Sequence, residues 1–231
     1  AVRETLLNFK INDGLEIHYD GDLPSKSGMG SSSSFVVGLL NVLKKYQKIK
    51  ISKKELAQKS FFIERNVLKE NVGYQDQIAA SYGGFNKINF TKKGFVVNKI
   101  KLKKNFVQAM NNNLFLVYTG YQRKAEKIAR TYTSKLSTKK KHNIKKILNH
   151  VKEADKLILD DNPNDFGKLL HETWLEKKCL SPSITNSKID EIYNFGIKNG
   201  ALGGKLLGAG GGGFILFYLD QNKIFNFKKK F

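Results

Sequence analysis

A run of glycine and serine residues at positions 28–34 has the residue types and the order that suit phosphate binding. It follows an alternating segment, Glu16–Asp20, and leads directly into an apolar stretch, Phe35–Leu43. Glycines let a bound group approach the backbone, and the free N–H groups at a helix start favour negative charge. The alternative, a serine linker, would be flanked by polar residues, and a Walker A pattern is absent. The predicted phosphate loop consists of Gly28, Met29, Gly30, Ser31, Ser32 and Ser33.

Two carboxylates follow this loop, and each has two interpretations. Glu64 falls on the apolar face of a predicted helix, among residues such as Leu56, Ile63 and Val67. Burying an unpaired carboxylate costs roughly several kcal/mol, so Glu64 needs a cation, a donor cluster or a metal. The candidates are a salt bridge or capping contact and a ligand for Mg²⁺, which prefers oxygen. Asp76 lies at the start of the next predicted helix, where it is either the N-cap of that helix or a catalytic carboxylate.

A second glycine loop lies near the end of the chain, at Gly208–Gly213. Its letters fit G-x-G-x-x-G, but a strand follows it instead of a helix, which argues against a dinucleotide fingerprint. A backbone concavity that closes on a substrate or a phosphate fits better, with Lys205 as a nearby cation or as an ordinary surface lysine. The four histidines show no ligand spacing, and no Ser-His-Asp order is visible. Trp174, with Lys177 and Lys178, is expected on a helix with a core face and a solvated face.

The pattern of apolar residues predicts a mixture of helices and strands. In the first half we expect strands at Glu16–Asp20, Lys87–Phe90 and Phe95–Ile100. We also expect three helices, one from Phe35, one from the Ser52/Glu55 capping box to about Glu70, and one from Asp76 to Gly83. In the second half we expect a strand at Leu114–Tyr118, helices between Arg123 and Glu176 that break at Lys139–Lys141 and Asn162-Pro163, a helix at Asn186–Asn199, and a glycine-rich loop from Gly200 that leads into a strand at Phe214–Leu219. The polar segment 102–113 separates the halves, so we place one domain at residues 1–108 and another at 109–231.

The composition narrows the functional class. The chain of 231 residues has a net charge of +21, but only four of its 41 basic residues are arginine, and the lysines are spread along the chain. Nucleic-acid readers favour clustered charge and arginine, so we expect no nucleic-acid partner, although the positive field attracts anionic substrates. The single cysteine, Cys179, favours a reducing compartment, which we take to be the cytoplasm. No apolar run approaches the roughly 20 residues that span a bilayer, so we expect no membrane partner.

Taken together, the two glycine segments resemble those of the GHMP kinases. The segment DLPSKSGMGSSSS is similar to the family motif P-x-x-x-G-L-G-S-S, with Met29 in place of Leu, and KLLGAGGGGFILF is similar to the C-terminal glycine motif. Between them, ENVGYQDQIAASYGGFN resembles the stretch that carries the family's aspartate. The resemblance implies an α+β fold of two domains, the first like ribosomal protein S5 domain 2 and the second ferredoxin-like. The family also begins with a strand and an R-I-S-F-x-G-G-G-T-D motif that nothing here matches, so we expect N-terminal strands upstream of this chain.

The same resemblance assigns roles by position. It implies that the loop from Gly28 to Ser33 binds ATP, that Ser32 and Glu64 hold Mg²⁺, and that Asp76 accepts the proton of the attacking hydroxyl or orients that hydroxyl. It also implies that a second set of residues braces the phosphates and the substrate. This set is Gly208, Ala209, Gly210, Gly211 and Gly212.

Within the family, the fourfold serine run, YTGYQR and HETWLEKKCLSPSI are most similar to kinases of a heptose 7-phosphate. The expected reaction is therefore transfer of the γ-phosphoryl group of ATP to the anomeric hydroxyl of D-glycero-D-manno-heptose 7-phosphate, as in surface polysaccharide biosynthesis. Arg123, Lys177 and Lys178 are candidates for binding the phosphate that this substrate carries. A GHMP kinase for another sugar, such as L-fucose, is the alternative, and a non-catalytic RNA-binding domain is a more distant one.

Overall fold

The computed structural model of the chain describes residues 1–22, 27–122, 125–133, 136 and 138–231. These residues form two compact units, which we describe separately. Unit 1 contains residues 1–22 and 30–101, and unit 2 contains residues 27–29 and 102–231. The phosphate loop is thus divided, with its first residues in unit 2 and the rest in unit 1.

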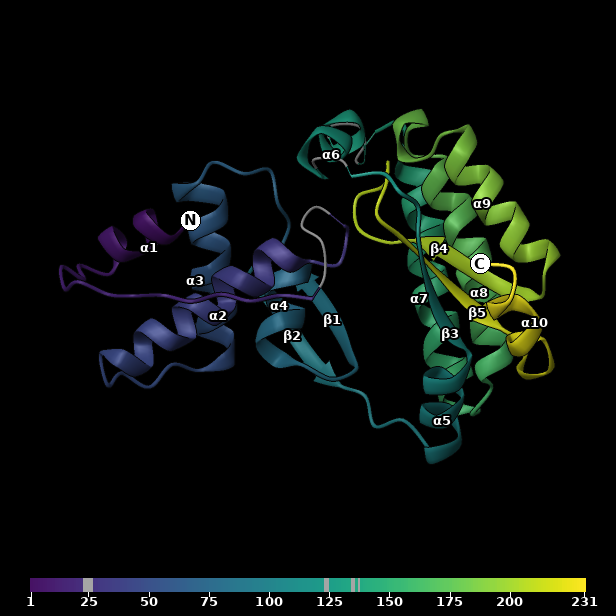
Figure 1. Ribbon diagram of the computed structural model, residues 1–231, viewed down its shortest axis with the longest axis horizontal. Helices are drawn as coiled ribbons and strands as arrows, with labels where there is room; N and C mark the ends of the chain where they lie inside the picture. The colour runs from purple at the N-terminus through teal and green to yellow at the C-terminus, as the bar shows by residue number, and fades with distance from the viewer. Residues whose placement is uncertain (23–26, 123–124, 134–135, 137) are drawn as a thin grey trace. The chain divides into compact units, whose positions relative to one another are not determined.

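Unit 1 is a group of helices with one hairpin (Figure 1). Val36, Val37 and Leu40 of the second helix are buried against Leu56 and Ile63. The Ser52/Glu55 capping box is confirmed, because each side chain bonds to the other residue's backbone at the start of the third helix. The elements are α1 (Val2–Asn8), α2 (Ser31–Tyr46), α3 (Lys53–Phe62), the π-helix η1 (Ile63–Val67), α4 (Gln75–Tyr82), β1 (Asn86–Thr91) and β2 (Gly94–Lys99).

The strand predicted at Glu16–Asp20 is wrong. Among the described residues these five form no strand, and Ile17 and Tyr19 on the supposed inner face are 39% and 63% exposed. Alternation alone does not make a strand, because its backbone groups need a neighbouring strand to pair with. The helix predicted from Ser52 to Glu70 also differs in detail, since it changes from α to π geometry after Phe62.

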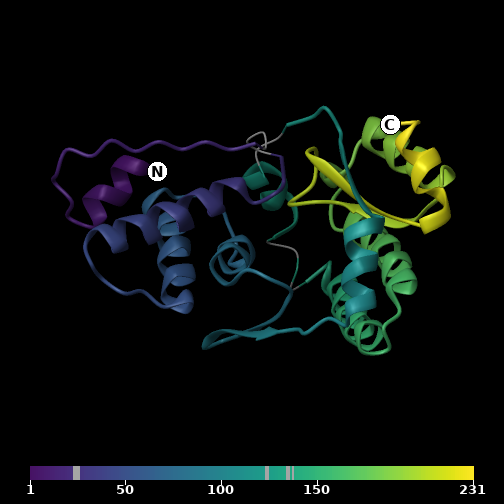
Figure 2. The same cartoon turned by 60° about the horizontal axis from the view of Figure 1, so that its bottom comes forward.

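Unit 2 is built on a three-stranded antiparallel sheet in the order β3-β5-β4 (Figure 1). Helix α8 packs along β4 and against α7, as both views show (Figures 1 and 2). The core contains Trp174, Tyr193, Phe217 and Phe227, so the prediction of Trp174 as a core aromatic is confirmed. The elements are α5 (Lys104–Asn113), β3 (Leu114–Tyr118), α6 (Ala125–Thr133), α7 (Lys141–Leu159), α8 (Pro163–Lys178), η2 (Pro182–Ile184), α9 (Ser187–Lys198), β4 (Ala201–Leu206), β5 (Phe214–Leu219), η3 (Gln221–Lys223) and α10 (Ile224–Lys228).

Helix α8 and strand β4 approach each other closely because both carry glycine at the contact. A Cβ atom on Gly203 would lie 2.1 Å from the carbonyl oxygen of Gly167. The glycine-rich residues 201–206 therefore form a strand under a helix, not the loop that we predicted for them. The α+β class is confirmed, and the expected division at 108/109 falls inside α5. Among the described residues, no helix is long and apolar enough to cross a membrane.

Candidate functional site

Glu64 lies at the centre of a buried polar cluster in unit 1. Its side chain is fully buried, and the Ser33 hydroxyl donates to its Oε1 atom at 2.9 Å. The amide Nε2 of Gln77 donates to its other carboxylate oxygen. The three residues come from α2, η1 and α4, so the cluster ties three helices of the unit together. Among the described residues no cation pairs with Glu64, and its side chain caps no helix, so the salt-bridge and capping interpretations find no contact.

The surroundings of Glu64 disfavour its charged form. Burial raises the pKa of its carboxyl above the ordinary value, and the negative charges of Glu70 and Asp76 act in the same direction. The hydrogen bonds from Gln77 and Ser33 oppose this shift, but they do not cancel it. A carboxylate held this way, without a cation, favours either a proton or a bound metal ion.

Asp76 lies beside the phosphate loop. A Cβ atom on Gly30 would be 3.3 Å from Asp76 Cγ, so the carboxyl group packs against the backbone of the loop. Tyr74 is the N-cap of α4 and Asp76 makes no capping hydrogen bond, so the N-cap interpretation is wrong. Asp76 is an exposed residue, yet the protein atoms around its carboxyl desolvate it and raise its pKa. A desolvated carboxylate that is still reachable can accept a proton from a bound hydroxyl.

The part of the phosphate loop that lies in unit 1 leads into α2. Gly30 is the N-cap of this helix with a φ of 71°, a left-handed conformation that favours glycine. No side chain among the described residues caps α2, and the first N–H groups of a helix have no partner within the helix, so they suit an anion. Ser31 is half-buried, Ser32 is exposed and Ser33 is buried.

The second glycine loop lies in unit 2, between β4 and β5. Residues of the first loop pack against it: a Cβ atom on Gly208 would be 2.8 Å from Gly28 Cα, and the N–H of Phe214 donates to the Ser27 oxygen at 3.1 Å. The N–H of Gly211 donates to Ile184 O. The structure thus brings Gly28 and Gly208, which are 180 positions apart in the sequence, into contact.

One residue that contacts Glu64 was not predicted. Ser32 was expected to share a Mg²⁺ ion with Glu64, which stays a prediction, and the side chain that hydrogen-bonds to Glu64 is that of the next residue, Ser33. Gln77 was missed altogether. It is buried together with Ile78 and Ser81, so a helical projection of α4 would have placed it on the inner face.

The donor atoms around Glu64 suit a hard cation. The Asp76 carboxyl is close enough for its charge to act on Glu64, and the Oε1 atom of Gln77 is buried without a hydrogen-bond partner among the described residues. Oxygen donors of this kind are the ligands that Mg²⁺ prefers. Among the described residues, no group of three or more His, Cys, Asp and Glu side chains gathers to hold a metal, so Mg²⁺ would also need water or phosphate oxygens.

Comparison with known proteins identifies the family. The model for the GHMP kinases N terminal domain matches residues 1–84, and the model for the GHMP kinases C terminal domain matches residues 143–230. The chain belongs to the GHMP kinase family, and the expected two-domain fold of that family is confirmed.

Two relatives and one solved structure illustrate what the chain is similar to. A D-glycero-alpha-D-manno-heptose 7-phosphate kinase from Campylobacter jejuni is 33% identical over 92% of this chain and 63% of its own length. An L-fucokinase/L-fucose-1-P guanylyltransferase from Bacteroides fragilis is 26% identical over 93% of this chain and 23% of its own length. The crystal structure of a D-glycero-D-manno-heptose 1-phosphate kinase from Bacteroides thetaiotaomicron superposes with a TM-score of 0.71 at 24% identity, covering 98% of this chain and 64% of that one, and shows the shared fold. The chain spans less than two thirds of the length of each relative.

Proposed function

We propose that the protein is a sugar kinase that transfers the γ-phosphoryl group of ATP to the anomeric hydroxyl of D-glycero-D-manno-heptose 7-phosphate, giving the 1,7-bisphosphate. The main structural support is the packing of the Asp76 carboxyl against Gly30 in the loop that opens α2. The choice of sugar is supported by the relative from Campylobacter jejuni, which is 33% identical. The reducing environment of the cytoplasm suits the free thiol of Cys179.

In this proposal, positioning and charge account for most of the catalysis. The N–H groups of Gly28 to Ser33 bind the phosphates of ATP, and the loop at Gly208–Gly212 braces the phosphates and the substrate. Asp76 accepts the proton of the anomeric hydroxyl, or orients that hydroxyl, as its oxygen bonds to the γ-phosphorus and the bond to ADP breaks. The raised pKa of Asp76 makes it a better proton acceptor than an ordinary aspartate. Glu64, with Ser32, would hold a Mg²⁺ ion, which when bound would neutralise charge on the phosphates.

The proposal is tested with the full-length protein that contains this chain. The protein is incubated with ATP and Mg²⁺ and with D-glycero-D-manno-heptose 7-phosphate, L-fucose or D-galactose, and the products are identified by ³¹P NMR. We expect a new anomeric phosphate signal with the heptose 7-phosphate alone. Transfer to a free sugar alone would contradict the proposed substrate, and failure to transfer to any of them would contradict the proposed reaction.

A kinase of an unphosphorylated sugar is the second candidate. It is favoured by the relative from Bacteroides fragilis, a fucokinase that is 26% identical over nearly all of this chain. The two candidates share the proposed roles of the phosphate loop, Glu64 and Asp76. They differ in whether the enzyme must bind a phosphate group that is already on the sugar.

A further inference from the structure

Two lysines of unit 2, Lys177 near the end of α8 and Lys205 on β4, lie close to each other. The ammonium of Lys177 donates to the carbonyl oxygen of Leu206 at 3.2 Å and to that of Gly208. Gly203 faces α8, and side chains alternate along a strand, so Lys205 lies on the same face, towards α8. Lys177 thus reaches the start of the second glycine loop, and Lys205 lies near enough for its charge to act on Lys177.

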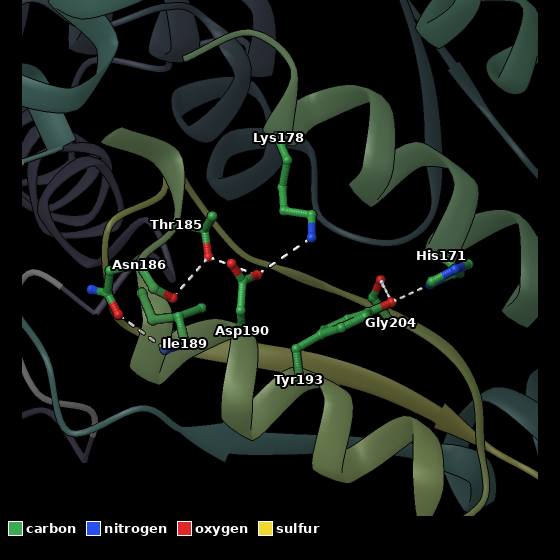
Figure 3. Close-up of polar contacts among 8 residues, drawn as sticks. All are labelled: His171, Lys178, Thr185, Asn186, Ile189, Asp190, Tyr193 and Gly204. Carbon is green, nitrogen blue, oxygen red and sulfur yellow. Dashed lines mark hydrogen bonds and ion pairs between the residues drawn. The ribbon is translucent and has the colours of Figure 1, made fainter. Parts of the chain in front are cut away.

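No carboxylate neutralises these two lysines among the described residues. The hydrogen bonds of Lys177 go to neutral carbonyl oxygens, and Lys205 makes none with the described residues. The neighbouring Lys178 behaves differently, since its ammonium pairs with Asp190 at 3.3 Å (Figure 3). Burial lowers the pKa of Lys205, and burial together with the charge of Lys205 lowers the pKa of Lys177 to about 7. Two desolvated ammonium groups side by side are unfavourable unless an anion joins them.

The N–H donors of Lys177 and Lys205 that have no acceptor among the described residues suit a phosphate group. Each ammonium has three N–H donors, and Lys177 uses two of them on Leu206 and Gly208, so it keeps one donor while Lys205 keeps three. A phosphate offers several charged oxygen acceptors to such donors. Figure 3 shows two pairs of polar side chains nearby that contact each other, Thr185 with Asp190 of α9 and His171 of α8 with Tyr193 of α9. Unlike these pairs, the ammonium groups of Lys177 and Lys205 have no side-chain partner among the described residues.

We infer that Lys177 and Lys205 form a phosphate-binding subsite, and that its ligand is the phosphate group that the sugar carries before transfer. This inference rests on the proposed function, in which the phosphates of ATP are bound by the loop that opens α2. It explains how a family with free sugars among its substrates would accept a sugar phosphate. Of the three basic residues that the sequence offered for this role, it uses Lys177 and adds Lys205, while Lys178 pairs with Asp190 and Arg123 lies outside the described residues.

The test compares a phosphorylated sugar with its unphosphorylated counterpart. Lys205→Met is the primary variant, because Lys205 makes no hydrogen bond with the part of the chain that the structure describes, so its loss breaks none there. Lys177→Met is the second, and Lys168→Met is the matched control, since Lys168 lies on the same helix and pairs with Asp165 at the surface. For the full-length protein we expect kcat/KM for D-glycero-D-manno-heptose 7-phosphate to fall about 10- to 100-fold in the two test variants. The KM for ATP, the kcat/KM for the unphosphorylated heptose and the control should change less than about threefold.

Binding of inorganic phosphate, measured by calorimetry with a non-hydrolysable ATP analogue bound so that the loop opening α2 is occupied, gives an independent readout. We expect it in the wild type and in Lys168→Met, and we expect it to be lost in Lys205→Met. A rise in the KM for ATP with no effect on the sugar phosphate would overturn the assignment to the sugar. Unchanged kinetics and unchanged phosphate binding would overturn the subsite itself. If the wild type transferred phosphate only to free sugars, the proposed function would be wrong. The calorimetric measurement would still test whether Lys177 and Lys205 bind phosphate.

Discussion

At the scale of single residues, the carboxyl groups of Glu64 and Asp76 are held in different surroundings. Glu64 is buried and receives hydrogen bonds from Ser33 and Gln77, whereas Asp76 is exposed and lies beside Gly30. A side chain that binds a cation must be held in place, as Glu64 is. A side chain that accepts a proton must be accessible to the substrate, as Asp76 is. The two environments therefore support different roles for two carboxylates that lie only 12 positions apart in the sequence.

The first prediction concerns Asp76. Replacing it with Asn keeps the shape of the side chain but removes its ability to accept a proton. We expect Asp76→Asn to lower kcat by about 10²- to 10⁴-fold, the range for general acid–base groups, while the KM for ATP changes little. The measurement is steady-state kinetics with the heptose 7-phosphate, and Gln75→Ala, an exposed neighbour on α4, is the control. An unchanged kcat in Asp76→Asn would reject the role as proton acceptor.

The second prediction concerns Glu64 and pH. Burial raises the pKa of its carboxyl above the ordinary value, so the folded state holds the proton more tightly than the unfolded state. The contribution of Glu64 to stability is therefore largest at low pH and is lost as the pH rises through its folded-state pKa. Glu64→Gln has no group to titrate at this position, so we expect its stability relative to that of the wild type to increase as the pH rises through the folded-state pKa of Glu64.

The measurement for Glu64 is thermal unfolding of both proteins between pH 4 and pH 8. Adding Mg²⁺ with ATP should raise the unfolding temperature of the wild type more than that of Glu64→Gln, because the variant has lost the charged ligand. A difference between the two proteins that stayed constant across the pH range would show that Glu64 does not titrate as its surroundings imply. An equal response to Mg²⁺ would remove Glu64 from the metal site.

At the scale of elements, local patterns predicted helices and hairpins well. The capping box at Ser52 and Glu55, the strand at Leu114–Tyr118 and the helix break at Pro163 are all read from neighbouring residues, and all three are confirmed. The failures involve contacts with distant residues. Glu16–Asp20 alternates but has no pairing partner among the described residues, and residues 201–206 form a strand because β5 pairs with them. Whether a segment becomes a strand depends on a pairing partner elsewhere in the chain, which a short window of sequence does not contain.

The third prediction tests the contact between α8 and β4. A Cβ atom on Gly203 would lie 2.1 Å from Gly167 O, so Gly203→Ala must push the helix away from the strand. We expect this to cost about 1–3 kcal/mol of unfolding free energy, the range for overpacked cores. Gly38→Ala is the control, because its Cβ would meet nothing within 4 Å and alanine favours the middle of α2. Urea unfolding measures both, and a Gly203→Ala protein as stable as the wild type would contradict the close contact.

At the scale of the whole molecule, the net charge of +21 affects both stability and the binding of anions. Mutual repulsion of lysines destabilises a compact chain, and the same field draws anionic substrates towards it. Exposed pairs such as Lys168 with Asp165 and Lys188 with Glu191 offset little of this repulsion. A protein of this composition gains stability from anions that screen its charge, and it gains more where an anion has a specific site.

The last prediction separates these two effects of anions. Screening lengths fall from roughly 30 Å at 0.01 M to roughly 10 Å at 0.1 M salt, so raising KCl over this range should raise the unfolding temperature. Phosphate at the same ionic strength should raise it further in the wild type, because it also occupies the pair formed by Lys177 and Lys205. Lys205→Met should keep the response to KCl and lose the additional response to phosphate, while Lys168→Met keeps both. A wild type that responded equally to the two salts would leave the high charge as a general property of the surface, with no specific anion site.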